Sequence, residues 1–415
     1  MQELLQKLNH SDVNERLSAL SALCKAESYT PTADVNNHIH TFYSFSPYSP
    51  SAAVYYARQA GLSTAGIMDH DSVSGLSEFR KAGSIAGLPV TCGLEIRVSL
   101  ADSPFYNRRV NNPDQDGVAY VALHSLPKAG EGAVAKALEK VSAARGERNR
   151  AMTKRLNEII APLEIAISYE DDIVPLSKAS EGGSVTERHI LFALSLKLME
   201  KFGKGEKLLA ALARLNLPIS EKNRRWLSDV ENPHYAYDLL GALKGELVAS
   251  FYIDAKDELL SAKEAVALAK ASGAIIAYAY LGDVTDSVTG DKRQQAFEDA
   301  YLDELVAYLH ETGFQAVTYM PSRNTKAQLD RLRKLCEKAG LLQISGEDIN
   351  SPRQGFICHA ARAPEFANLT DAAWALIGSE KAAEQDVSKA MFGPEDNLLR
   401  PELSAKVAYY KNLAR

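Results

Sequence analysis

Cysteine is scarce in this sequence, and its four residues lie far apart. Cys24, Cys92, Cys336 and Cys358 form no CxxC pair. Structural thiolate zinc sites and disulfide frameworks both rely on closely spaced or regularly paired cysteines. Neither kind of site is indicated, so we expect buried free thiols.

Long apolar runs and net positive charge are also missing. No run reaches the roughly eighteen apolar residues that a membrane helix needs, and the first residues, MQELLQKLNHSDVNERL, do not resemble a signal peptide. We therefore expect a cytoplasmic protein with no membrane partner. The formal charge of -6 argues against an extended nucleic-acid surface, although a nucleotide ligand in a local basic cleft stays compatible with it.

What the sequence does contain is an alternation of short apolar segments with helical stretches. Six segments after Asp34 read as buried strands that end in polar residues: TAGIMDHD, LPVTCGLEI, GVAYVALHS, GAIIAYAYLGD, FQAVTYMPS and LLQISGED. Parallel strands that carry polar residues at their C-terminal ends are typical of α/β barrels. The pattern predicts an α/β fold, specifically a distorted parallel (β/α)7-like barrel.

Helical stretches interrupt and flank this predicted barrel. The N-terminal residues carry two short helical patterns, the second opened by Ser11 or Asp12 as N-cap. A long middle stretch has almost no strand signal and reads as amphipathic helices. We place an N-terminal helical extension at 1–33, the first part of the barrel at 34–127, a mostly helical insertion at 128–255, the second part of the barrel at 256–360 and a C-terminal helical segment at 361–415.

The segment DVNNHIHTFYS contains the first candidate metal ligands. His38 and His40 alternate at strand spacing, so both imidazoles face the same side, where they can meet one metal ion. An isolated H-x-H pair more often consists of ordinary hydrogen-bonded histidines. The other acidic and histidine clusters in the sequence favour the metal interpretation.

Three further clusters follow predicted strands. Asp69, His70 and Asp71 end one strand, and a helix-capping role for Asp71 or Ser72 explains only one of the three. Glu95 lies in an apolar strand, where a buried carboxylate needs a cation. Either Arg97 or a metal could supply that cation. Near the end of the series, Glu347 and Asp348 close LLQISGED, which again suggests an ion.

In order and residue type, these clusters resemble the motifs of the polymerase and histidinol phosphatase (PHP) superfamily of metal-dependent phosphoesterases. The resemblance runs from Asp34 to Ser351. VTERHILFAL is similar to the R-P-H-I-A motif of the branch of small phosphatases and nucleases, and ARGERNRAMTKRL is similar to the arginine-rich helix that precedes this motif.

The resemblance implies roles for individual residues. His38, His40, Glu95 and Asp348 would hold the first metal, with Glu95 as the bridging carboxylate, and Asp69 of the D-H-x motif would join the metal ligands. His70, and His189 at the histidine of R-P-H-I-A, would be catalytic residues that assist proton transfer.

Several positions depart from the family pattern. Phe45 replaces the aspartate of the S-D-G turn, Asn350 replaces the histidine of the final D-x-H, and Tyr278 replaces the histidine of A-H-P. Tyr120 stands where another histidine is expected, and His124 could substitute for it only under a shifted alignment. Because a protonated tyrosine is a poor ligand for zinc or manganese, we expect one well-formed site for Mn, Zn or Fe and a weak second site.

Three arginines are candidates for substrate binding. Arg188 adjoins His189, while Arg323 and Arg353 follow strand ends in MPSRNT and NSPRQ. A guanidinium group binds phosphate through two parallel hydrogen bonds, although a single arginine is more often a solvated surface residue.

Two functions follow from these features. The first is a metal-dependent phosphoesterase-like hydrolase that acts on a small phosphorylated metabolite or nucleotide through a metal-activated water. The alternative is a non-catalytic PHP-like protein that binds a metal or small ligand in a degraded active site. The replaced ligands favour the alternative, and the complete first site favours the enzyme.

Overall fold

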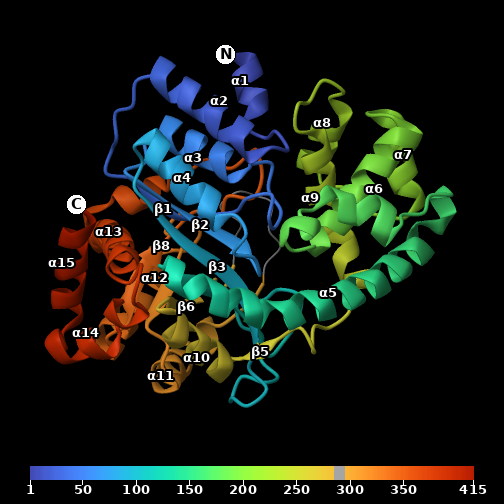
Figure 1. Cartoon of the computed structure of the whole chain (residues 1–415). Helices are drawn as coiled ribbons and strands as arrows, with labels where there is room; N and C mark the ends of the chain where they lie inside the picture. The colour runs from blue at the N-terminus through green and yellow to red at the C-terminus, as the bar shows by residue number, and fades with distance from the viewer. Residues whose placement is uncertain (285–294) are drawn as a thin grey trace.

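The computed structural model describes residues 1–284 and 295–415, and its centre is a curled β-sheet (Figure 1). The strands are β1 (Val35–Ile39), β2 (Thr64–His70), β3 (Val90–Ser99), β4 (Val118–His124), β5 (Leu260–Ser261), β6 (Ile275–Ala279), β7 (Ala316–Tyr319) and β8 (Leu342–Ser345). They are hydrogen-bonded in the order β1-β2-β3-β4-β6-β7-β8, with β5 added to β3. The six predicted strand segments each contain one strand, and the predicted barrel-like α/β fold is confirmed.

Helices cover this sheet and also form a separate group beside it (Figure 1). They are α1 (Gln2–Lys7), α2 (Val13–Ala26), α3 (Pro50–Gln59), α4 (Leu76–Ala86), α5 (Glu131–Ile160), α6 (Glu187–Phe202), α7 (Glu206–Arg214), α8 (Glu221–Ser228), α9 (Tyr235–Phe251), α10 (Ala262–Ser272), α11 (Leu302–Thr312), α12 (Lys326–Ala339), α13 (Ala367–Ala382), α14 (Pro394–Leu399) and α15 (Leu403–Ala414). Asp12 caps α2 by accepting a hydrogen bond from the Asn14 backbone N–H, as the sequence predicted. None of the described helices has both the length and the apolar character needed to cross a bilayer.

Strand β4 runs against the predicted direction. It is antiparallel to both β3 and β6, because residues 100–117 turn the chain straight back without the helix that a parallel crossover uses. His124, the last residue of β4, therefore pairs with Ile275, the first residue of β6. The prediction that this strand also delivers its C-terminal residues to the common site is wrong.

The barrel closes between β1 and β8 through side chains as well as backbone. The Asn36 side-chain amide donates to the Glu347 and Phe356 carbonyls, and Asn37 donates to the Ser345 carbonyl. At Gly346 a Cβ atom would lie 2.7 Å from the His38 Cβ, so only glycine allows this approach. The closure brings the chain after β8 beside the histidines of β1.

Alternate residues along the strands pack in different cores. Met68, Ala122, Ala277, Ala316 and Ile344 form the inner core, together with residues of α13. Apolar residues next to them on the strands, such as Ile67, Val121 and Ile276, belong to the outer core, which lies under the covering helices. Helix α13 closes the end where the parallel strands begin, since its Glu380 accepts a hydrogen bond from the Cys92 backbone N–H.

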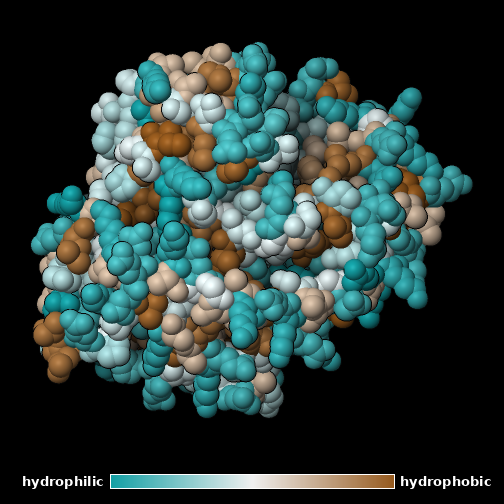
Figure 2. All heavy atoms as spheres, viewed as in Figure 1, coloured by the Kyte–Doolittle hydropathy of each residue, from teal (hydrophilic) through white to brown (hydrophobic). Residues whose placement is uncertain are grey.

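The helices between residues 131 and 251 pack around a separate hydrophobic core, which is built mainly from α5, α6, α7 and α9. In Figure 1 this green and yellow group stands beside the barrel, and the long helix α5 runs along both. Figure 2 shows polar residues over most of the visible face of both parts, with apolar residues in small separate patches.

Candidate metal centre

His38 on strand β1 and His40, the residue that follows the strand, lie on the inner side of the barrel. The His38 backbone N–H donates to Asn36 Oδ1 at 2.9 Å. The His40 N–H donates to the Ile349 carbonyl at 2.9 Å, and the Ile349 N–H donates to the His38 carbonyl at 3.1 Å. The two imidazole centroids are 5.0 Å apart. The strand spacing of the H-x-H pair therefore brings the rings together as predicted.

Glu95 and His70 come from adjacent strands and complete this cluster. They are register partners in the β2–β3 ladder, and His70 Nδ1 lies 3.1 Å from Glu95 Oε2. One potential ligand atom each from His38, His40 and Glu95 can be chosen so that all three lie within 4.8 Å of one another. Two ligand atoms that each lie about 2 Å from one zinc-like ion are at most about 4 Å apart, so these three donors lie close to the spacing that a divalent metal requires.

Asp348 reaches the same cluster from the segment after β8. Its Oδ1 lies 3.2 Å from His40 Nε2, and 38% of its side chain is exposed. The backbone bonds between Ile349 and β1 hold it there. The hydrogen bond with His40 and the nearby imidazole charge keep the pKa of Asp348 well below its usual range, although burial acts in the opposite direction.

The charge balance of this cluster favours a cation. Burial raises the pKa of Glu95 to about 8, with a smaller opposing effect from His40. Burial, followed by the charge of His40, lowers the pKa of His38 to about 4, so this ring is neutral at pH 7. The sequence left Arg97 as a possible partner of Glu95, but Arg97 pairs with Glu258 instead. Among the described residues, no lysine or arginine forms an ion pair with Glu95.

Asp69 lies beside this cluster but faces a loop. One of its oxygens accepts hydrogen bonds from the Thr41 N–H and the Ser44 hydroxyl, and the other accepts from the Thr41 hydroxyl, each at 2.6 Å. The Ser44 hydroxyl also lies 3.3 Å from His40 Nδ1. Asp69 therefore fixes residues 41–44 and, through Ser44, the orientation of His40.

Asp71 and Ser72 do not cap the following helix, contrary to one sequence prediction. Helix α4 begins at Leu76, and its N-cap residue Gly75 has no side chain to offer. Asp71 forms an ion pair with Arg145, and the Ser72 hydroxyl donates to the Gly182 carbonyl. Both side chains bind the helical group of residues 131–251 or its connections to the barrel.

His189 occupies a helix cap. Its Nδ1 accepts a hydrogen bond of 3.0 Å from the Thr186 N–H, which closes the capping box of α6. Phe45 meets the imidazole edge-on at a centroid distance of 5.0 Å, and Phe192 and Tyr237 pack against the same phenyl ring. The residue that replaces an expected aspartate thus fills the space beside His189 with aromatic carbon.

The two tyrosines at expected histidine positions lie in different places. The Tyr120 ring is 5.8 Å from the His70 ring, at the edge of the metal cluster. Tyr278 belongs to the outer core, on the opposite side of β6 from the inner residue Ala277. Tyr278 therefore points away from the metal cluster, because side chains on a strand alternate between its faces.

The three arginines predicted to bind substrate also lie in different places. Arg188 Nη1 donates to Asn350 Oδ1 at 2.6 Å, next to Asp348. Arg353 forms two hydrogen bonds with Asp238 and stacks on Trp226. The Arg323 Nε donates to the Leu281 carbonyl. Arg188 is the one of these three that contacts a neighbour of the metal cluster.

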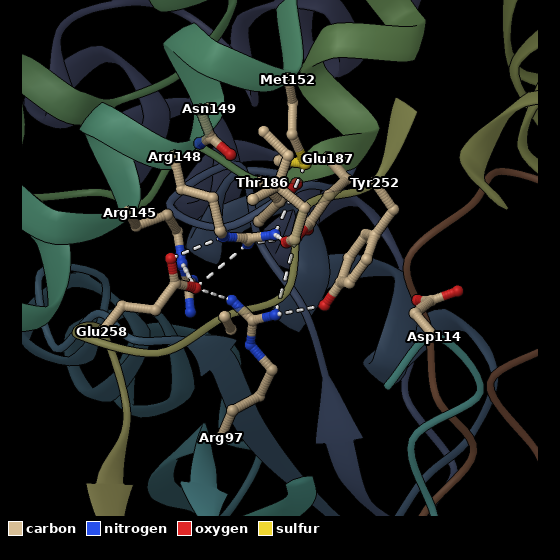
Figure 3. A network of polar contacts seen from close by, with 12 residues as sticks. Arg97, Asp114, Arg145, Arg148, Asn149, Met152, Thr186, Glu187, Tyr252 and Glu258 are labelled. Carbon is tan, nitrogen blue, oxygen red and sulfur yellow. Dashed lines mark hydrogen bonds and ion pairs between the residues drawn. The ribbon is translucent and has the colours of Figure 1, made fainter. Parts of the chain in front are cut away.

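Sequence reasoning missed a buried ion network and a lysine next to this site. Figure 3 shows Glu258 between Arg97, Arg145 and Arg148, with Glu187 beside Arg148. The arginine-rich helix gives some sign of such a network in the sequence. The carboxylate at the centre of the network, Glu258, is 110 residues from Arg148 in the sequence, so the pairing could not be predicted. Lys244 on α9, which is close enough to affect Asp348 and Arg188 electrostatically, has no sequence signal at all.

Comparisons with known proteins identify the fold. No protein-family profile and no curated protein matches the chain. A presumed metal-dependent phosphoesterase from Bifidobacterium adolescentis has a TM-score of 0.52 at 21% identity, and the match covers 80% of this chain and 96% of that one. An amidohydrolase from Chromobacterium violaceum, solved with sulfate and no metal, has a TM-score of 0.51 at 17% identity, over 79% and 90% of the two chains. At these identities the likeness establishes a common fold.

Proposed function

We propose that this protein is a metal-dependent hydrolase of PHP type that cleaves a phosphoester of a small metabolite or nucleotide. The observation that carries the proposal is the buried Glu95 carboxylate, which faces His38 and His70 and has no lysine or arginine ion-pair partner among the described residues. An uncompensated carboxylate is costly to bury, and a divalent cation removes that cost. Both structural neighbours carry names of hydrolases, which supports the general class.

The ligand set of this site would be His38, His40, Glu95 and Asp348. A divalent ion bound there supplies a Lewis acid and lowers the pKa of a bound water toward about 7. His70 is our candidate for proton transfer, because burial keeps its pKa well below the usual value and leaves a neutral ring beside Glu95. We prefer it to His189, whose Nδ1 is already used by the helix cap.

The substrate phosphate would bind on the side of Arg188. Of the predicted arginines, Arg353 is already paired with Asp238, whereas Arg188 is bonded only to the neutral Asn350 side chain among the described residues. The sulfate in the Chromobacterium violaceum structure supports oxyanion binding by a protein of this fold.

One observation favours a non-catalytic binding protein instead. Phe45 fills the space beside His189 together with Phe192 and Tyr237, which puts an aromatic ring where the family pattern has an acidic ligand for an additional ion. If catalysis requires more than one metal, the protein would bind a metal and a ligand without turning the ligand over.

Metal content and hydrolysis together test the proposal. We expect the purified protein, after loading with Mn²⁺ or Zn²⁺, to retain about one ion per chain by elemental analysis and to hydrolyse p-nitrophenyl phosphate. Glu95→Gln should lose the ion and the activity, because it removes a charged ligand. Glu139→Gln, an exposed change on α5, is the control. A wild-type protein that retains no ion after loading would overturn the proposed metal centre, and retained ion without turnover would favour the binding protein.

A further inference from the structure

A pocket of about 630 Å³ opens on the helical group. Its wall is formed by α8, by the residues that lead into α9 and by the segment after β8, and it is lined among others by Lys222, Arg225, Trp226, Asn232, His234 and Arg353. A volume of this size accommodates an organic ligand rather than a single ion. No candidate metal ligand is among the described residues that line it, so the pocket is separate from the metal centre.

Positive charge dominates the wall of this pocket. Lys222 and Arg225 both line it from α8, and residues three apart lie on the same face of a helix. Arg353 adds a third cation from the segment after β8. Asp229 is the one acidic residue among the described residues that line the pocket, and its carboxylate accepts a hydrogen bond from the Glu231 N–H. The pocket therefore favours an anion.

Trp226 brings two of these cations together. The Arg353 Cζ lies 4.3 Å from the centre of the indole ring, and the Lys222 Nζ lies 4.8 Å from the centre of the same ring. The face of an aromatic ring attracts a cation. The indole therefore holds Lys222 and Arg353, which come from separate parts of the chain, beside each other in one pocket.

Arg353 is fixed by its other contacts. Its Nε and Nη2 donate to the two oxygens of Asp238 at 2.6 and 2.7 Å, and Nη2 also donates to Asn232 Oδ1 at 3.2 Å. These bonds do not use Nη1, and 34% of the side chain is exposed, so Nη1 can still donate to a ligand. Asp238 offsets the charge of Arg353. Arg225, by contrast, has no ion-pair partner within the described part of the chain.

We propose that this pocket binds a small molecule that carries a diphosphate or triphosphate chain. Such a chain has charged oxygens along its length, so it can contact cations on α8 and on the segment after β8 at the same time. A nucleoside triphosphate and inorganic tripolyphosphate share this chemistry, and the nucleotide can also stack its base on an aromatic ring. The inference goes beyond the proposed function, because it requires neither the metal nor hydrolysis.

Trp226 provides a direct readout of binding. The chain has two tryptophans, so in a Trp374→Phe background the fluorescence comes from Trp226 alone. We expect tripolyphosphate and ATP, added to the full-length protein before any metal loading, to change this fluorescence in a saturable way. Isothermal titration measures the same binding independently. If neither compound gives a saturable fluorescence change or a heat of binding, the proposal is wrong.

Two adjacent arginines test whether the pocket itself binds the anion. Both are exposed on α8, but only Arg225 is among the residues that line the pocket, whereas Arg224 is not. We expect Arg225→Met to weaken binding about tenfold, because a charged hydrogen bond to phosphate is lost. Arg225→Lys should retain most of the affinity, and Arg224→Met is the matched control. Equal losses in Arg224→Met and Arg225→Met would reduce the effect to general attraction by a basic surface and would overturn the pocket.

Three ligands identify what the pocket recognises. Equal affinity for tripolyphosphate and ATP assigns the site to the phosphate chain alone, and tighter binding of ATP assigns it to a nucleotide. Adenosine that binds as tightly as ATP would contradict the proposal, because the phosphates would then contribute nothing. A protein that binds these anions through Arg225 but cleaves no ester would refute the hydrolase proposal and leave the phosphate pocket standing.

Discussion

Glu95 and His70 are the two residues of the candidate metal centre that come from adjacent strands. Both face the barrel interior, and they are neighbours in the β2–β3 register. Strand periodicity makes such an inward orientation predictable from sequence. The competing pairing of Glu95 with Arg97 could be decided only from the structure, where Arg97 is paired with Glu258.

Asp69 gives a prediction at this scale. Its carboxylate accepts three hydrogen bonds from Thr41 and Ser44, so we expect Asp69→Ala to destabilise the protein by about 3 kcal/mol through lost buried hydrogen bonds. Asp69→Asn keeps the shape and most of these bonds, and should retain the metal. Urea unfolding and elemental analysis measure the two effects.

Comparison with Glu95→Gln decides the role of Asp69. If Asp69 were a metal ligand, as the family resemblance implies, Asp69→Asn would lose the ion as completely as Glu95→Gln. Retention of the ion in Asp69→Asn together with its loss in Glu95→Gln identifies Asp69 as a residue that positions the loop and His40.

At the scale of elements, the buried ion network joins the helical group to the barrel. Arg97 comes from β3, Arg145 and Arg148 come from α5, and Glu258 precedes β5 (Figure 3). Glu258 is only 2% exposed and contacts all three arginines. The network therefore holds α5 across the edge of the barrel, next to the candidate metal centre.

Glu258→Gln tests this role. Removing the charge leaves buried guanidinium groups without their shared carboxylate, and breaking a buried ion pair costs about 3 to 5 kcal/mol. We expect a loss of that size in the free energy of unfolding, measured in urea. Glu170→Gln removes the exposed partner of Arg150 and should cost less than about 1 kcal/mol. Similar losses in the two variants would mean that the network contributes no more than a surface pair.

At the scale of the whole molecule, buried neutral histidines make stability depend on pH. Burial lowers the pKa of His189 to about 3 and that of His124 to about 3, compared with about 6.5 in an unfolded chain. Below pH 6.5 the unfolded state binds protons that the folded state does not bind. The stability that these neutral histidines contribute is therefore fully present above about pH 6.5 and is lost as the pH drops toward 3.

One variant measures how much His189 contributes to this pH dependence of the unfolding free energy. Each such histidine contributes up to about 1.4 kcal/mol per pH unit. Glutamine at position 189 can still close the capping box with Thr186 but does not titrate. We expect His189→Gln to reduce the pH dependence of the unfolding free energy between pH 6 and 4 by up to that amount. An unchanged slope in urea unfolding would show that His189 is protonated in the folded protein.

The sequence by itself determined the strands, the barrel-like fold and the inward pair His38 and His40, because these follow from local periodicity and from the polar residues at strand ends. It also indicated Glu95 as a buried carboxylate in need of a cation. These features depend on residues that are close in the sequence, so no distant contact is needed to recognise them.

Only the tertiary structure decided the direction of β4 and the partners of the charged residues. A strand pattern is the same in either direction, so the reversal through residues 100–117 left no periodic signal. Arg353 is paired with Asp238, 115 residues away, whereas Arg188 bonds to the neutral Asn350 side chain and to no carboxylate within the described part of the chain. Charges are offset by whichever groups folding brings within a few ångströms, and that proximity is a property of the packed chain.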